Sequence, residues 1–260
     1  MANSKVVLVI GATGGLGRGI AEDLASTGWR TIVAGRNAAK CEAIVAVVKK
    51  KGGEATFIAF DILSSESIAQ LHEKAVTTYG RLDAAVNSAG TTGDFTKFAD
   101  STPENTANVL QINLHGVILS MQHQIRLMRA NPGGSGGHII NMSSVYGSHG
   151  GQYASIYAGT KHALNGITKS AALEVSGPKD NILVNCIAPG VILTEMTAIL
   201  GDPSVLPDGE MKDYIMTLKG QYPQQRYGEI GDVARGCRYL LESPWVTGTV
   251  LEIEGGFGAK

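Results

Sequence analysis

The sequence predicts an α/β protein built on a doubly wound parallel sheet, in a single domain that spans residues 1–260. The first observation is that short apolar runs alternate with longer stretches of helical period along the chain. The second is that the runs are apolar almost throughout, which is typical of parallel strands covered by helices on both faces. The third is that no linker, repeat or low-complexity tract interrupts the pattern, so we propose no domain boundary.

The elements follow one another in regular order. The first half should hold strand 5–10, helix 16–28, strand 30–34, helix 38–51, strand 55–60, helix 65–79 and strand 84–87. Pro103 suits the first turn of a long helical stretch, 103–130, and Pro132-Gly133-Gly134 ends it. The second half should hold strand 138–142, helix 155–175, strand 182–188, helix 230–242 and strand 250–253.

Residues 193–227 do not fit the alternation, because apolar side chains stand there among prolines and glycines. An insertion at the carboxyl end of a strand lies where open α/β sheets bind ligands. We interpret the segment as a mobile, apolar lid over a substrate. The alternative is an amphipathic helix pair packed on the body of the protein.

Composition argues against several classes of partner. A net charge of -1 without runs of like charge argues against nucleic acid or an anionic membrane. No segment is long enough to span a bilayer, and the apolar stretch 6–10 is too short for a signal-peptide core. Cys41, Cys186 and Cys237 have no metal-like spacing, so we expect buried, reduced thiols and no metal site. We expect a soluble cytoplasmic protein.

A glycine-rich turn stands between the first expected strand and the first expected helix. Small residues there let the backbone approach a pyrophosphate, and the helix N-terminus supplies N–H donors and a positive dipole end. The spacing is Gly-x-x-x-Gly-x-Gly, not Gly-x-Gly-x-x-Gly, but the strand before it and the helix after it supply the required context. The turn predicts a dinucleotide cofactor bound by Gly11, Thr13, Gly14, Gly15, Leu16 and Gly17.

The end of the second expected strand indicates which dinucleotide. NAD-binding proteins of this design place an acidic side chain there for the ribose hydroxyls, whereas this chain has Gly35-Arg36-Asn37. An arginine without an acidic neighbour offers a planar, permanently charged fork to a phosphate. The sequence therefore predicts NADP(H), bound through Arg36 and Asn37. The alternative is that Arg36 is an ordinary solvated loop residue.

Tyr157 and Lys161 stand one turn apart on an expected helix, so both side chains project from the same face. A phenol with a pKa near ~10 is a poor acid–base catalyst at neutral pH, but a fixed cation beside it favours the phenolate. Alone, the pair is more typical of a solvated helix face. With the glycine turn, and with Ser144 thirteen residues before Tyr157, it indicates hydride transfer with a nicotinamide cofactor.

With these motifs in order, the chain resembles the short-chain dehydrogenase/reductase family over residues 6–256. It departs at Ile10, where the family usually has a Thr whose hydroxyl is thought to brace the turn. The family's Asn-Asn-Ala-Gly and Pro-Gly segments have counterparts at 87–90 and 189–194. The resemblance implies a Rossmann fold. It also adds cofactor contacts at Asp61, which would touch the adenine, and at Ile62, Asn87, Ala89, Gly90, Tyr157, Lys161, Pro189, Gly190, Ile192 and Thr194.

By the same resemblance the catalytic group is Asn113, Ser144, Tyr157 and Lys161. Ser144 would bond the substrate carbonyl oxygen, and Tyr157 would donate its proton as hydride leaves the nicotinamide. Lys161 would lower the pKa of Tyr157 and hold the nicotinamide ribose. Asn113 would interrupt its helix and seat a water that relays protons to Lys161. Ser143 should point the other way along the strand end.

The sequence thus predicts an NADP(H)-dependent carbonyl reductase, equivalently a secondary alcohol dehydrogenase, whose substrate is a small-molecule ketone or alcohol. The Met and Leu residues of 193–227 favour a bulky, lipophilic substrate. Alternatives are an epimerase or dehydratase that recycles bound NADP, and a non-catalytic NADP-binding sensor. Tyr146, His149 and Tyr153 stay open as substrate contacts. The resemblance implies a homotetramer or homodimer, paired through 108–128, 155–175 and the last strand.

Overall fold

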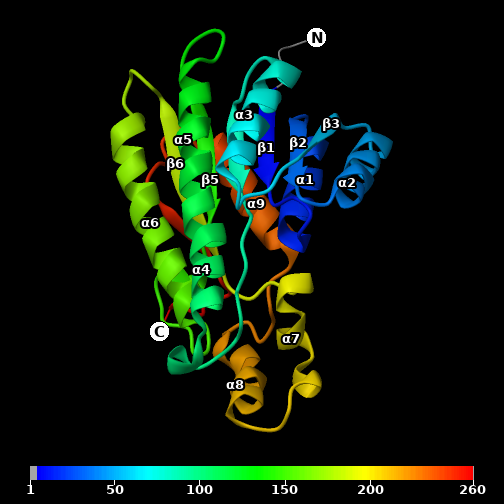
Figure 1. Cartoon of the computed structure of the whole chain (residues 1–260). Coiled ribbons are helices and arrows are strands. Elements are labelled where there is room, and N and C mark those ends of the chain that lie inside the picture. Colours follow the sequence, from blue (N-terminus) through cyan, green and yellow to red (C-terminus); the bar gives the residue numbers. More distant parts are fainter. Residues whose placement is uncertain (1–4, 260) are drawn as a thin grey trace.

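The protein is described by a computed structural model of residues 5–259, so residues 1–4 and 260 of the predicted domain lie outside the described residues. One parallel sheet runs through the described chain in the order β3-β2-β1-β4-β5-β6-β7, with helices on both faces (Figure 1). Its strands are β1 (Val6–Ile10), β2 (Arg30–Gly35), β3 (Ala55–Ala59), β4 (Ala84–Asn87), β5 (Gly137–Met142), β6 (Ile182–Pro189) and β7 (Val250–Ile253). The predicted single-domain, doubly wound α/β fold is confirmed.

Two helical layers cover the sheet, and β1 shows why its sequence is apolar throughout. Val7 and Val9 belong to the core shared with α1 (Gly15–Ser26), α2 (Ala38–Lys50) and α9 (Ile230–Glu242). The remaining side chains of β1 belong to the core shared with α3 (Ser65–Tyr79), α5 (Gly116–Arg129) and α6 (Ser155–Val175). Because side chains alternate between the faces of a strand, burial on both faces requires an apolar residue at every position.

The strand order reverses between β1 and β4, and the turns after these two strands touch. Gly11, directly after β1, has φ of +79°, and a Cβ there would lie 2.5 Å from the Ala89 backbone nitrogen. Only glycine fits such a turn. Backbone N–H groups of Gly11 and Ala12 both donate to the Ala34 carbonyl, at 3.0 and 3.1 Å. The turn is therefore braced from β2, without the hydroxyl that the chain lacks at Ile10.

The long helical stretch predicted at 103–130 is present with one interruption. α4 (Pro103–Leu110) begins after Thr102, whose hydroxyl accepts a hydrogen bond from the Asn105 backbone N–H. A π-helical turn, Gln111–His115, separates α4 from α5. The interruption expected at Asn113 is thus observed. Such single π turns are common at functional sites.

Residues 193–227 form helices at the carboxyl end of the sheet, where α7 (Ala198–Gly201) and α8 (Glu210–Leu218) extend away from the body in Figure 1. Leu200, Ile215 and Leu218 form a small core of their own in this segment. The helices named in the alternative interpretation are therefore present. That the segment moves as a lid stays a prediction.

The described residues carry few other special features. Cys41, Cys186 and Cys237 are free and buried. No helix in the part of the chain that is described combines the length and apolar character needed to cross a membrane. Within residues 5–259, no group of three or more His, Cys, Asp and Glu side chains could hold a metal ion.

Candidate active site

A cavity of about 260 Å³ opens at the carboxyl ends of β1, β4, β5 and β6, at the point where the strand order reverses. Open α/β sheets bind their ligands at this position. Of the predicted site residues, those that line the cavity are Gly11, Gly14, Gly15, Leu16, Gly17, Gly90, Ser144, Tyr157, Lys161, Pro189, Gly190, Ile192 and Thr194.

Ser144 and Ser143 follow β5 and both line the cavity, but their hydroxyls have different partners. Ser143 donates to the Asn165 side-chain oxygen at 2.6 Å, so its hydroxyl is directed toward α6. Ser144 Oγ accepts a hydrogen bond from the Tyr146 backbone N–H at 3.2 Å. The Ser144 hydroxyl also bonds the phenol of Tyr157. The arrangement supports the choice of Ser144 over Ser143.

Tyr157 and Lys161 lie on one face of α6, with Lys161 Nζ 5.4 Å from the centre of the Tyr157 ring. Nζ donates to the Met142 carbonyl at 2.6 Å. Burial lowers the pKa of Lys161 to about 8. Burial also raises the pKa of Tyr157, and the bond with Ser144 acts in the opposite direction. Burial and Ser144 are thus the causes of the Tyr157 shift in this arrangement, and the lowering of its pKa by Lys161 stays a prediction.

Asn113 is completely buried and joins the π-helical turn to the loop after β4. Its amide nitrogen donates to the Thr91 carbonyl and its oxygen accepts from the Thr91 N–H, both at 2.8 Å. A Cβ at Gly90 would lie 3.4 Å from Asn113 Oδ1 and 3.8 Å from Lys161 Nζ. Asn113 and Lys161 therefore flank the same small space beside Gly90, as a water relay between them requires.

The N-terminus of α1 faces the cavity and suits an anionic group. Gly14 is its N-cap and offers no side-chain hydrogen bond, and the first turn, all of it described, holds no acidic side chain. Helix N-terminal N–H groups left without partners bind phosphate groups well. The approach is narrow, since a Cβ at Gly15 would lie 3.0 Å from the Thr194 side chain. These features fit a dinucleotide pyrophosphate held by the turn Gly14–Gly17.

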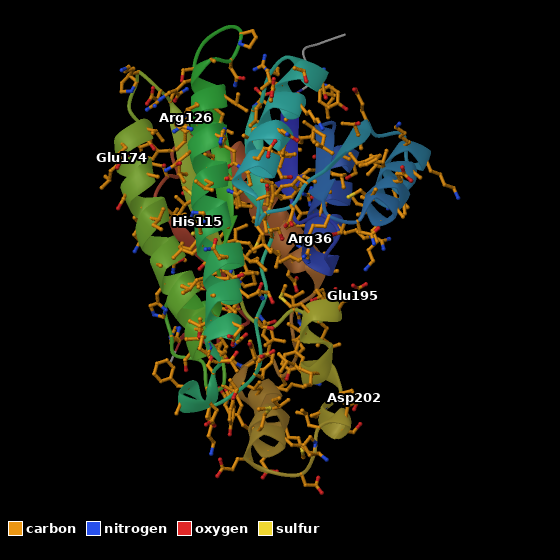
Figure 2. The ribbon with its side chains drawn as sticks, in the orientation of Figure 1. Arg36, His115, Arg126, Glu174, Glu195 and Asp202 are labelled. Carbon is orange, nitrogen blue, oxygen red and sulfur yellow. The ribbon has the colours of Figure 1, made fainter. Side chains whose placement is uncertain are left out.

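Other predicted cofactor residues lie along the same sheet edge but outside the cavity. Arg36 and Asn37 are exposed after β2, where Figure 2 labels Arg36, and Asn37 Oδ1 caps α2 by accepting the Lys40 N–H at 2.9 Å. Thr13 packs over Gly35, because a Cβ at Gly35 would lie 2.8 Å from its methyl group. Arg36 is thus placed at the carboxyl end of β2 with its charge free to meet solvent.

The third group of predicted cofactor residues follows β3 and β4. Asp61 is half-buried and accepts the Leu63 N–H at 3.1 Å, while Ile62 belongs to the core. The Asn87 side chain exchanges hydrogen bonds with Gln124 and donates to Asn141 at 2.8 Å. Asn87 therefore holds β4 against β5 and α5. The residues of the same motif that line the cavity are Ser88 and Gly90.

Several cavity residues were not predicted, and they are Ser88, Met142, Ser143, Glu195, Met196 and Thr197. Three of them form a short turn, Glu195–Thr197, that follows Thr194 directly. Their position after the Pro-Gly segment could therefore have predicted that they line the cavity. Glu195 pairs with Lys40 of α2 at 3.3 Å. No pattern in the sequence could show this pair, because it joins residues far apart along the chain.

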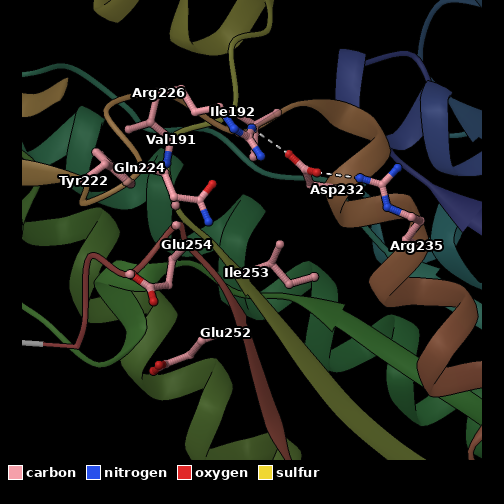
Figure 3. A pocket seen from close by; sticks show the side chains of 14 residues that line it. Val191, Ile192, Tyr222, Gln224, Arg226, Asp232, Arg235, Glu252, Ile253 and Glu254 are labelled. Carbon is pink, nitrogen blue, oxygen red and sulfur yellow. Dashed lines mark hydrogen bonds and ion pairs between the residues drawn. The ribbon is translucent and has the colours of Figure 1, made fainter.

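A larger cavity of about 350 Å³ lies on the other side of Gly190 and Ile192, which line both cavities. Figure 3 shows Asp232 there between two arginines, with hydrogen bonds of 3.0 Å from Arg226 and 2.6 Å from Arg235. Ser144, Tyr157 and Lys161 lie outside this larger cavity. The side chains that line each cavity, and not its size, identify the candidate active site.

Comparison with known proteins agrees with this geometry. The family model described as short chain dehydrogenase matches residues 5–203. The chain belongs to the short-chain dehydrogenase/reductase family. The resemblance drawn from the motifs is thereby confirmed, and as a family member the protein is an NAD(P)-dependent oxidoreductase that acts on small molecules.

Two curated relatives span nearly the whole chain. The 3-oxoacyl-(acyl-carrier-protein) reductase FabG of Aquifex aeolicus is 36% identical over 255 residues, covering 97% of this chain and 96% of its own. Carbonyl reductase family member 4 of Xenopus laevis is 34% identical over 253 residues, covering 97% and 98%.

Solved structures of family members superpose closely. A variant of actinorhodin polyketide ketoreductase with NADPH has a TM-score of 0.89 and 29% identity, covering 100% of this chain and 99% of its own. ElxO with NADP bound has a TM-score of 0.85 and 26% identity, covering 99% and 100%.

Proposed function

We propose that the protein transfers hydride between NADP(H) and a ketone or secondary alcohol. One observation carries the proposal: Ser144, Tyr157 and Lys161 meet at a cavity that the uncapped N-terminus of α1 also lines. A charged dinucleotide and a reducible carbonyl can therefore be held in one place. The names of the reductases among the relatives, and the NADPH and NADP bound to structural neighbours, support the same function.

The role of each catalytic residue in the proposed reaction follows from its contacts. The cofactor, when bound, supplies or accepts the hydride. Ser144 and Tyr157 share a hydrogen bond, so a carbonyl oxygen that meets one hydroxyl meets both. The raised pKa of Tyr157 keeps its phenol protonated, as a proton donor to the developing alkoxide must be. Lys161 would bind the ribose hydroxyls, and Asn113 would seat the water that returns a proton to it.

A preference for NADP(H) over NAD(H) rests on the end of β2. Arg36 is exposed there, and Gly35-Arg36-Asn37 brings no carboxylate to the ribose. A 2'-phosphate would gain a charge-assisted hydrogen bond from Arg36. Asp61 and Ile62, at the end of β3, would then flank the adenine.

Residues 193–227 support a bulky, lipophilic substrate. Met196 lines the cavity and is 46% exposed, and Leu193, three residues earlier in the same segment, is 48% exposed. Apolar side chains exposed at a cavity mouth bind apolar ligands. We propose that this segment closes over the substrate as a lid.

We also propose a homotetramer or homodimer. Leu173 on α6 is 89% exposed and Leu110 on α4 is 43% exposed, and both helices belong to the expected pairing faces. Figure 2 shows Glu174 and Arg126 on the outer side of the same helical layer. There they could form ion pairs at the rim of an apolar contact between subunits. The cytoplasmic location stays a prediction from the sequence.

A panel of ketones and secondary alcohols, followed by nicotinamide absorbance, tests the function. We expect at least one bulky ketone to oxidise NADPH. A product that is isomerised or dehydrated without net consumption of NADPH would replace the proposal with the epimerase or dehydratase. Binding of NADPH with no change in any compound of the panel would favour the sensor.

A further inference from the structure

Asn165 connects α6 to the chain on both sides of Ser144. Its side-chain oxygen accepts a hydrogen bond from the Ser143 hydroxyl at 2.6 Å. Its side-chain nitrogen donates to the Gly147 carbonyl at 3.0 Å. The Gly147 backbone N–H in turn donates to the Ser144 carbonyl at 2.8 Å. One side chain of α6 therefore holds the residue before Ser144 and the turn after it, and we name Ser143, Gly147 and Asn165 the loop clamp.

The loop clamp is tightly packed and fully paired. A Cβ at Gly147 would lie 2.6 Å from Ser143 Oγ and 2.7 Å from Asn165 Nδ2, so any other residue would push the turn away from α6. Ser143 and Asn165 are buried, at 3% and 8% exposed. Both ends of the Asn165 amide have a partner, and buried polar groups that are all paired favour a single arrangement. The clamp therefore fixes the loop against the helix.

Asn165 shares a helix face with the catalytic pair. It follows Lys161 by four residues, as Lys161 follows Tyr157, and side chains at this spacing lie on one face of a helix. Lys161 Nζ bonds the Met142 carbonyl at the end of β5. The bonds that hold segment 142–147 from α6 therefore come from the same face that carries Tyr157.

The hydrogen bond between Ser144 and Tyr157 depends on how the loop sits against α6. Ser144 belongs to the loop and Tyr157 belongs to the helix, so no local geometry sets the distance between their hydroxyls. Ser144 Oγ also accepts the Tyr146 N–H, but that donor belongs to the same loop and moves with it. A displacement of about 1 Å at a catalytic group can lower the rate on the order of a hundredfold.

We infer that Asn165 is a positioning residue that holds Ser144 at hydrogen-bond distance from Tyr157. This rests on the proposed function, in which these two hydroxyls meet one carbonyl oxygen. Asn165 is not among the described residues that line the cavity, whereas Ser143 and Ser144 are. It acts through Ser144, so its loss should slow the chemical step and leave the binding of NADPH as it is.

The test removes the clamp with Asn165→Ala and follows reduction of a ketone from the panel. We expect kcat to fall about ten- to a hundredfold, with the Kd of NADPH unchanged. Asn185→Ala is the matched control. Asn185 is 1% exposed and also makes two hydrogen bonds, to the Val246 carbonyl at 2.8 Å and from the Thr249 N–H at 3.1 Å. These bonds join β6 to the segment before β7, so the control should lose similar stability and keep its kcat.

A double-mutant cycle with Ser144→Ala separates positioning from a structural role. In the Ser144→Ala background, Asn165→Ala should lower kcat by less than about twofold, because the group that it positions is already absent. A general loosening of α6 would also displace Tyr157 and Lys161, and the two losses would then multiply. Ser143→Ala removes one of the two anchors and should give an intermediate loss.

An NMR measurement tests the clamp without turnover. In protein that carries isotope-labelled tyrosine, the signal of the Tyr157 ring carbon bonded to oxygen reports the hydrogen bond of its phenol. Tyr157→Phe identifies this signal. Asn165→Ala should move it to the position that it has in Ser144→Ala, and Asn185→Ala should leave it in place.

The inference is overturned if the losses of Asn165→Ala and Ser144→Ala multiply, or if Asn185→Ala lowers kcat as much as Asn165→Ala does. An unmoved NMR signal in Asn165→Ala would refute the clamp even in an enzyme that reduces ketones, and the proposed function would stand. A moved signal in a protein that reduces no ketone would support the clamp and refute the reductase.

Discussion

Replacing Lys161 by methionine should change how the free energy of unfolding depends on pH, and it should also lower turnover. Lys161 is 4% exposed, and burial lowers its pKa from 10.5 to about 8. A pKa difference of one between the folded and unfolded states corresponds to about 1.4 kcal/mol of folding free energy. The fall from 10.5 to about 8 therefore means that the buried ammonium destabilises the fold by about 3 kcal/mol below pH 8. Methionine has similar length and no charge, and Lys161→Met removes this destabilisation.

The sign of the pH dependence follows from the two states. Between the folded pKa of about 8 and the ordinary value of 10.5, the unfolded chain binds a proton that the folded chain has lost. The free energy of unfolding of the wild type should therefore rise with pH across this window. In Lys161→Met this rise is absent, and the variant instead leaves the Met142 carbonyl unpaired, which costs about 1–3 kcal/mol at every pH.

Urea denaturation of both proteins at a series of pH values measures the effect. Near pH 7 the lost charge and the lost hydrogen bond of the variant offset each other, and we expect nearly equal stability. Towards the ordinary lysine pKa the wild type should become more stable than Lys161→Met by about 3 kcal/mol, because all other groups titrate alike in both. If the difference in free energy of unfolding between the two proteins does not change with pH over this range, Lys161 does not have a lowered pKa in the folded state. Turnover by the variant at wild-type rates would refute its place in the site.

Four further predictions concern catalysis, cofactor, assembly and motion. Tyr157→Phe should lower turnover by a factor on the order of 10² to 10⁴ with NADPH affinity unchanged, and retention of a tenth of the wild-type rate would contradict its role as proton donor. Arg36→Ala should weaken NADPH about ten- to a hundredfold and NADH far less in fluorescence titrations, whereas equal losses would place the phosphate elsewhere. Light scattering should give the mass of a dimer or tetramer, and a stable monomer at micromolar concentration would remove that proposal. Hydrogen exchange should show protection of residues 193–227 on NADPH binding and little change in 138–142, while protection already high without ligand would mean fixed packing.

The fold was predictable because its signals are local. Strands buried on both faces must be apolar at each position, as in Val6–Ile10, and the predicted helices 65–79, 155–175 and 230–242 end where the structure ends them. The helix predicted at 16–28 ends instead at Ser26, since Thr27 and Gly28 complete the turn by bonding carbonyls of the last helical residues. Terminal turns are the least specific part of a periodic pattern.

The site was predictable where its parts are close in sequence. Tyr157 and Lys161 share a helix face by spacing alone, and the glycine turn follows its strand directly. The resemblance supplied Ser144 and Asn113. Spacing could not show the partners of these groups, such as Met142 for Lys161 or Thr91 for Asn113. The direction of the Tyr157 pKa shift also lay beyond the sequence, because it depends on burial, which raises the pKa, and on the contact with Ser144, which lowers it.

The sequence by itself determined the sheet and the covering helices, because periodicity, turn residues and short spacings are properties of the chain, and its motifs are the basis on which the catalytic side chains are proposed. Only the tertiary structure decided which distant segments meet. It pairs Glu195 with Lys40, places Tyr214 of α8 against Tyr146 and Tyr153, and leaves the Tyr153 hydroxyl buried without a described partner. These contacts depend on how packed elements face one another, and burial sets the pKa and pairing of each group only once the surrounding atoms are in place.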